Sequence, residues 1–154
     1  MGLRLSAVNE DAVSLNRAPA RVTGAGPEVS SVVRVLPDDP SSSRLQIVER
    51  GGSAWAVAWP GVNSHLRSMH RISLSGGGMT LKMRHPMEAV YYVISGDLAV
   101  EDDQSGSSQR LVAGSMAFVE AQTRYRFVAG DRGSELVGGP CPPDPGLYRH
   151  LLED

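Results

Sequence analysis

The sequence predicts an all-β protein, and three observations indicate this class. From Leu45 onward, short β-prone runs such as "AWAVAW" and "AVYYVI" recur at strand-like intervals. Turn residues, mainly glycine and serine, separate these runs, and no long stretch before the C-terminus shows helical periodicity. Many short strands joined by glycine turns favour a closed or double-sheet β structure.

The elements follow in chain order. Residues 1–43 are rich in proline, glycine, aspartate and serine, and two β-prone strips at 20–23 and 32–36 predict extended N-terminal arms and edge strands. Residues 1–20 are either part of such an arm or a disordered tail. Residues 44–154 are interpreted as a single domain with its core at 45–140, and the terminal "DPGLYRHLLED" predicts a short helix that begins at Asp144 or Pro145. The strands between are expected at 45–50, 54–59, 70–74, 79–83, 89–94, 97–102, 109–113, 116–120, 124–129 and 134–139.

Composition narrows the function classes. The net charge of −2 gives no electrostatic footprint for nucleic acid or an anionic membrane surface, so neither is an expected partner. The single cysteine, Cys141, excludes an internal disulfide framework and a multi-thiolate zinc site. Neither a signal peptide nor a membrane span is visible, and we expect a cytoplasmic protein.

The glycines of the β region stand at characteristic distances from a few other residues. Five residues separate Gly77 from Met83; His85, Ala89 and Gly96 then follow at fixed intervals. A second stretch runs from Gly114 through Glu120 and Gln122 to Tyr125 and Ala129. This spacing resembles the two motifs of the cupin superfamily, G-x5-H-x-H-x3-E-x6-G and G-x5-P-x-G-x2-H-x3-N. The resemblance covers residues 73–133 and implies a double-stranded β-helix, the RmlC-like cupin jelly-roll barrel.

The glycine spacing matches the cupin motifs closely, but most of the metal-ligand positions hold other residues. In metal-binding cupins, two histidines and a glutamate of the first motif and a histidine of the second hold a divalent metal. The corresponding positions here are Met83, His85, Ala89 and Tyr125, so only one ligand is retained. A first-row divalent ion needs at least three protein donors at about 2.0–2.3 Å. We therefore expect no tightly bound metal and no other cofactor.

Glu88 offers an alternative ligand or acid-base group. The segment "EAVY" that begins at Glu88 resembles a segment of ectoine synthase, a cupin enzyme whose glutamate there binds iron. Adjacent residues of a regular strand point to opposite faces, so Glu88 should point away from the interior if Ala89 faces it. A β-bulge near Pro86 would instead turn Glu88 inward. Both orientations remain open from the sequence.

Strand alternation also predicts the residues that line the barrel. The residues expected inside are apolar or aromatic, with a few polar groups, as in a small-molecule pocket. His85, Tyr125 and Glu88 are the candidate catalytic residues, since a histidine and a phenol without metal can perform general acid-base chemistry. Each histidine also has a structural interpretation, as a buried side chain bonded to the backbone. The candidate substrate pocket consists of His70, Met83, Tyr91, Trp59 and Phe127.

Three functions are consistent with this site. The first is an enzyme of isomerase, cyclase or lyase type that acts on a small metabolite through His85 and Tyr125. The second is a non-catalytic ligand-binding or accessory cupin, and the third is a metal-dependent cupin with a changed ligand set. Because cupins commonly dimerise through sheet edges, the N-terminal strips are expected to serve as exchanged edge strands in a homodimer.

Overall fold

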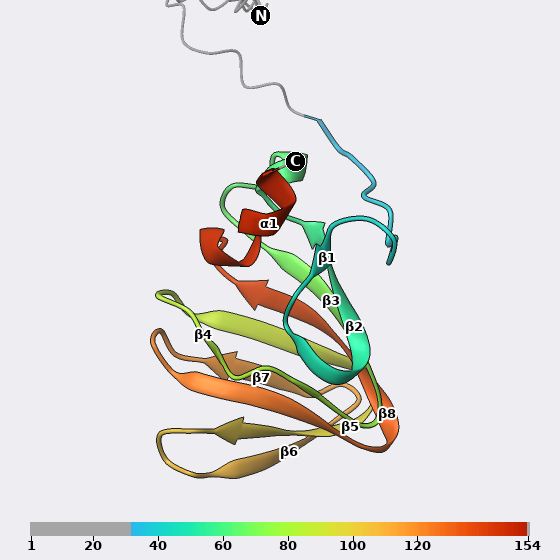
Figure 1. Cartoon of the computed structure of the whole chain (residues 1–154), viewed down its shortest axis with the longest axis vertical. Helices are drawn as coiled ribbons and strands as arrows, with labels where there is room; N and C mark the ends of the chain where they lie inside the picture. The colour runs from blue at the N-terminus through green and yellow to red at the C-terminus, as the bar shows by residue number, and fades with distance from the viewer. Residues whose placement is uncertain (1–31, 154) are drawn as a thin grey trace, which may run out of the picture. The chain divides into compact units, whose positions relative to one another are not determined.

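The computed structural model describes residues 32–153, in which eight strands pair antiparallel and the sheet folds back on itself (Figure 1). The strand order is β1-β2-β3-β8-β5-β6, and β4 pairs with β8 while β7 pairs with β5. The elements are β1 (Arg44–Leu45), β2 (Val48–Ala58), the 3-10 turn η1 (Pro60–Val62), β3 (Met69–Thr80), β4 (Met83–Arg84), β5 (Ala89–Asp102), β6 (Ser108–Val112), β7 (Met116–Val119), β8 (Arg124–Pro140), the 3-10 turn η2 (Pro145–Leu147) and the helix α1 (Arg149–Leu152).

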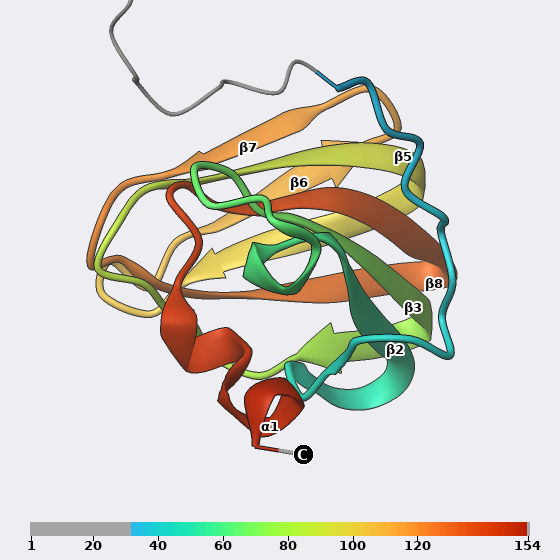
Figure 2. The ribbon, with the colours of Figure 1, turned by 90° about the horizontal axis from the view of Figure 1, so that it is seen from above.

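Strands β5 and β8 form the common wall of two layers. They pair along almost their whole length, and the register shifts on both sides of Gly96 mark the point where they bend (Figure 2). The first half of β5 pairs with β7 and the second half with β6. Because each long strand therefore belongs to both layers, the layers enclose one interior, as in a jelly roll.

Alternation along β5 and β8 fills this interior. Ala89, Tyr91 and Val93 are buried on β5, and Tyr125 and Phe127 are buried on β8. The ring centroids of Tyr91 and Phe127 are 4.9 Å apart, an edge-to-face contact of the kind that stabilises aromatic cores. The all-β jelly-roll prediction is confirmed.

Several expected turns are bends within strands. The glycines at 51–52, 76–78, 96 and 130–133 lie inside β2, β3, β5 and β8, where the strand register shifts or the backbone curves. Ten predicted strands therefore merge into fewer, longer ones. A glycine without a side chain suits a tight turn and a bulge equally well, and only the pairing partner distinguishes them.

The prediction for the C-terminal end is confirmed, whereas the described part of the N-terminal arm differs from its prediction. The C-terminal helix is confirmed, although it is only the short η2 and α1. Residues 32–36 form no strand, so this strip is not an edge strand of its own chain. The strip at 20–23 lies outside the described residues, and the domain boundary at residue 43 stays a prediction. No helix of the described residues is long and apolar enough to cross a membrane.

Candidate functional site

The four positions that correspond to cupin metal ligands lie together in the barrel interior. Met83, His85, Ala89 and Tyr125 are all buried, and Met83 is the strand partner of Tyr125. The rings of His85 and Tyr125 are 6.1 Å apart. The geometric frame of the motif is therefore present, with different side chains in it.

His85 is oriented by a residue from the C-terminal segment. Its Nδ1 lies 2.8 Å from Oδ2 of Asp144, and the other oxygen of that carboxylate accepts a hydrogen bond from the backbone N–H of Gly146. An ionised carboxylate only accepts hydrogen bonds, so Nδ1 carries the proton and donates it to Asp144. In the neutral ring, Nε2 is then left with its lone pair, and this atom is buried without a partner among the described residues. His85 thus has the form of an oriented base.

Tyr125 is bonded to a second tyrosine. The hydroxyl oxygens of Tyr125 and Tyr91 are 2.7 Å apart. Burial raises the pKa of both hydroxyls above the ordinary tyrosine value, and the neighbouring tyrosine raises that of Tyr125 further. Both phenols stay neutral at physiological pH. One donates to the other, which leaves one hydroxyl proton free for a third group.

A second histidine lies in the same interior. His70 is fully buried, and its Nε2 is 2.6 Å from the hydroxyl of Tyr148. Burial, with a smaller contribution from His85, lowers the pKa of His70 to about 3, so this imidazole is neutral at physiological pH. The ring of Trp59 packs against Tyr148 at a centroid distance of 5.3 Å. Two His–acid pairs, His85–Asp144 and His70–Tyr148, therefore lie under the C-terminal segment.

The remaining predicted site residues separate into two groups. Phe127 and Met83 are buried in the wall of the interior, next to the tyrosine pair. Glu88 is exposed, while the adjacent Ala89 is buried. Glu88 therefore does not join His85 and Tyr125, because the strand enters the sheet without a bulge that would turn its side chain inward.

The donor set does not fit the metal that cupins often hold. Of the four motif positions, only His85 offers a nitrogen donor, and a neutral phenol and a thioether are poor ligands for a first-row divalent ion. Within residues 32–153, no three His, Cys, Asp or Glu side chains are grouped so that they could hold a metal ion. No step of the chemistry is therefore assigned to a metal.

A hollow reaches the interior beside Tyr125. It has a volume of about 280 Å³ and lies between β5, β6 and β7. Val100, Val119 and Tyr125 form an apolar wall, and polar residues follow its rim. This mixture is typical of small-molecule sites. The polar lining residues are Asp102, Ser107, Gln109, Glu120 and Thr123.

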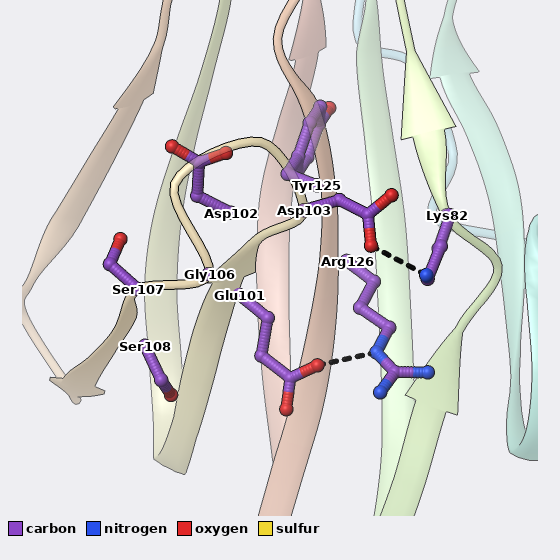
Figure 3. A pocket seen from close by; sticks show the side chains of 9 residues that line it. All are labelled: Lys82, Glu101, Asp102, Asp103, Gly106, Ser107, Ser108, Tyr125 and Arg126. Carbon is purple, nitrogen blue, oxygen red and sulfur yellow. Dashed lines mark hydrogen bonds and ion pairs between the residues drawn. The ribbon is translucent and has the colours of Figure 1, made fainter.

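Figure 3 shows the residues that line another hollow. This hollow has a volume of about 310 Å³ and shares Asp102, Ser107 and Tyr125 with the first. Four of its five charged side chains are paired, since Lys82 Nζ lies 2.5 Å from Asp103 and Arg126 Nε lies 2.6 Å from Glu101. The fifth, Asp102, accepts hydrogen bonds from its own loop. Arg126 alternates with the buried Phe127, so these ion pairs face away from the interior. Both pairs are at least partly exposed, so they have small energetic weight, and they are no part of the histidine site.

Sequence reasoning missed Asp144 and Tyr148 as site residues. The sequence indicates only that Asp144 and Tyr148 belong to a terminal helical stretch. Their distances along the chain from His70 and His85 do not indicate contact with these histidines. The signal that was present is chemical: an acid and a phenol follow a proline-rich segment, directly after the last strand. Only the chain reversal after β8 carries them back over the barrel.

Comparison with known proteins identifies the fold. No protein-family model matches the sequence, and no curated protein matches it significantly. Among solved structures, KdgF from Halomonas sp. is 19% identical over 75% of this chain and 98% of its own, with a TM-score of 0.59. The polyketide cyclase RemF from Streptomyces resistomycificus is 19% identical, covering 75% and 82% of the two chains, with a TM-score of 0.57. An RmlC-like cupin from Shewanella frigidimarina is 19% identical, covering 70% and 91%, with a TM-score of 0.56.

These similarities define the class of protein: an all-β protein with an antiparallel, barrel-like fold. More particularly, the chain has the fold of the cupin superfamily, as its motif spacing predicted. At these identities the likeness shows the fold alone. The resemblance to ectoine synthase stays a prediction, since none of these three structures bears on it.

Proposed function

We propose that the protein is an enzyme of isomerase, cyclase or lyase type that uses His85 as a general base on a small molecule. The observation that carries the proposal is the state of His85: Nδ1 is held by Asp144 at 2.8 Å, and the buried Nε2 has no partner among the described residues. An imidazole held in this way accepts a proton at Nε2, and the adjacent carboxylate stabilises the cation that forms.

The tyrosine pair supplies the complementary acid. The proton lost by a substrate C–H or O–H bond moves to Nε2 of His85, and negative charge develops on a neighbouring substrate oxygen. The free hydroxyl proton of the Tyr91–Tyr125 pair donates a hydrogen bond to this oxygen, and later proton return from His85 completes an isomerisation or ring closure. In this scheme Asp144 is a positioning residue, because it acts through His85.

Replacing His85 by asparagine tests the base. The asparagine amide N–H can still donate to Asp144, but the base at Nε2 is lost, so turnover is expected to fall about 10²- to 10⁴-fold. Turnover of a panel of hydroxylated carbonyl metabolites is followed by NMR in D₂O, in which proton abstraction appears as loss of a substrate C–H signal. The matched control is His65→Asn at an exposed histidine, which should leave turnover unchanged. Equal turnover in wild type and His85→Asn would remove His85 from the mechanism.

A non-catalytic ligand-binding cupin is the second candidate function. It is favoured by the closure of the site, because Tyr148 and His70 are fully buried beneath the C-terminal segment. If a ligand binds in the hollow with equal affinity to wild type and His85→Asn, and no substrate bond changes in either, this function replaces the enzyme. A cytoplasmic location and the lack of a cofactor stay predictions under both functions.

A homodimer is supported by the outer face of β5 and β7. Apolar side chains form neighbouring pairs there, the half-buried Val90 beside the exposed Phe118 and the exposed Tyr92 beside Met116, with Ile94 next along the strand. The set contains no charge, so it offers nothing to a charged partner, whereas a two-fold related copy presents the same uncharged sheet face. With a net charge of only −2, two copies repel each other weakly.

Phe118→Asp is expected to dissociate this dimer. A charge in the middle of an apolar contact loses its hydration without a partner, so the molar mass by light scattering should fall from twice 16.4 kDa to 16.4 kDa. Val112→Asp, at an exposed apolar position on β6, is the control and should stay dimeric. A wild-type protein that is monomeric at micromolar concentration, or a dimer that both variants keep, contradicts this interface.

A further inference from the structure

The side chain of Tyr148 occupies a closed compartment against β3 and the turn η1. Its ring is fully buried, and its centroid lies 5.3 Å from that of Trp59 and 5.6 Å from that of His70. Its hydroxyl lies 2.6 Å from Nε2 of His70. The compartment therefore holds a phenol between an aromatic surface and a hydrogen-bonding imidazole, which is how proteins commonly bind a hydroxylated ring.

The compartment has more hydrogen-bonding capacity than Tyr148 uses. Nε1 of Trp59 and Nδ1 of His70 are buried and have no partner among the described residues. Both atoms belong to side chains that contact the ring of Tyr148. Because buried polar atoms in proteins are almost always paired, two unpaired ones on the side chains that contact one aromatic ring indicate a site for a ring that carries further polar groups.

Tyr148 is carried by a segment that takes no part in the sheet, although Leu147 and Leu151 pack against the core. No β-pairing joins residues 141–152 to a strand. Beyond Asp144, the side-chain hydrogen bonds that hold the segment are those of Tyr148 to His70 and of His150 Nε2 to the backbone oxygen of Arg44 at 2.7 Å. Prolines at 142, 143 and 145 restrict the chain before Gly146, so Gly146 is the natural pivot.

We propose that this compartment is a binding subsite for a hydroxylated aromatic ring of the ligand, and that Tyr148 fills it until the ligand displaces residues 146–152. The subsite rests on the proposed function, since it gives a ligand class to the same interior site. Asp144 precedes the pivot and stays bonded to His85 when Tyr148 leaves. The ring then lies beside the oriented base rather than in place of it.

The first experiment opens the compartment by substitution. In full-length Tyr148→Gly, the missing side chain equals p-cresol, and calorimetry with p-cresol and toluene compares the same ring with and without its hydroxyl. We expect p-cresol to bind at least 10-fold more tightly than toluene, and the double variant Tyr148→Gly/His70→Leu to lose this preference. Equal binding of the two rings, or no binding of either by folded protein, overturns the subsite.

The second experiment uses the wild-type chain, so it does not depend on the stability of a variant. Hydrogen exchange is measured for the amides of Tyr148 and Leu151, which are bonded to the backbone oxygens of Pro145 and Tyr148. With excess 4-methylcatechol these amides should exchange at least 3-fold faster, while those of β5 and β8 stay protected; toluene should have no effect. Unchanged or slower exchange overturns the displacement of Tyr148.

Both readouts report binding, so they are independent of turnover. If the ring binds as expected but His85→Asn keeps full turnover, the acid-base function fails and the subsite stands. If His85→Asn abolishes turnover but neither phenol binds as expected, the subsite fails and the function stands.

Discussion

Gly96→Ala is expected to destabilise the protein by about 2–5 kcal/mol, measured as the loss of free energy of unfolding in urea. Gly96 lies inside β5 with φ +76°, a conformation that costs an L-residue about 1–2 kcal/mol. A Cβ at this position would lie 2.0 Å from the backbone oxygen of Gly133. Since the obstacle is backbone, β5 and β8 must move apart at their bend, which adds about 1–3 kcal/mol.

Gly106→Ala is the matched control. Gly106 has a similar φ of +69°, but a Cβ there would meet nothing within 4 Å. Its expected cost is the conformational part alone, about 1–2 kcal/mol. The difference between the two losses of free energy of unfolding measures the steric cost of a Cβ where β5 lies close to β8. Equal losses would show that the two strands adjust freely at the bend.

The free energy of unfolding is expected to fall steeply as pH drops from about 6.5 to 3, and His70 is expected to cause much of this fall. Burial, with a smaller effect of His85, lowers the pKa of His70 to about 3 in the folded protein, against about 6.5 in an unfolded chain. Between these values the unfolded chain binds a proton that the folded protein does not. Stability therefore rises with pH across this window, by up to about 1.4 kcal/mol per pH unit and about 5 kcal/mol in all.

His70→Gln tests this pH dependence. Glutamine cannot take up the proton, yet its amide can still form a hydrogen bond with Tyr148, so the variant should lose less stability between pH 7 and 3.5 than the wild type. Carboxylates titrate in the same range in both proteins, so the difference between them reports His70. His65→Gln removes an exposed histidine and should keep the wild-type pH dependence. Parallel curves for wild type and His70→Gln would show that His70 is protonated in the folded state as readily as in the unfolded chain.

Strand parity accounts for the part of the site that was predictable. Once His85 and Tyr125 are taken to face inward, the period of two along a strand puts Met83, Ala89 and Tyr91 on the side of His85 and Phe127 on the side of Tyr125, and all are buried. The same rule favours an outward Glu88 beside an inward Ala89, which is the arrangement found. These are local consequences of backbone geometry, and they need no knowledge of what the strand pairs with.

Hydrogen-bond partners could not be predicted in this way. Tyr125 bonds to Tyr91, 34 residues away, and His85 bonds to Asp144, 59 residues away. Which polar atoms meet depends on how two layers approach and on where the chain returns after its last strand. Each of these hydrogen bonds joins two distant segments, and neither segment's sequence indicates which other segment will supply the partner.

The sequence by itself determined the class of the fold, the positions of the β-prone runs and the spacing of a cupin motif that retains one of four ligands, because these depend on alternation and turn chemistry over short distances. Only the tertiary structure decided that the glycines at 51–52, 76–78, 96 and 130–133 bend strands rather than end them, since a bulge exists only against a paired strand. It also decided that the C-terminal segment brings Asp144 and Tyr148 to the two interior histidines. The physical reason is that a buried imidazole must find hydrogen-bond partners wherever the folded chain supplies them, however far away they are in sequence.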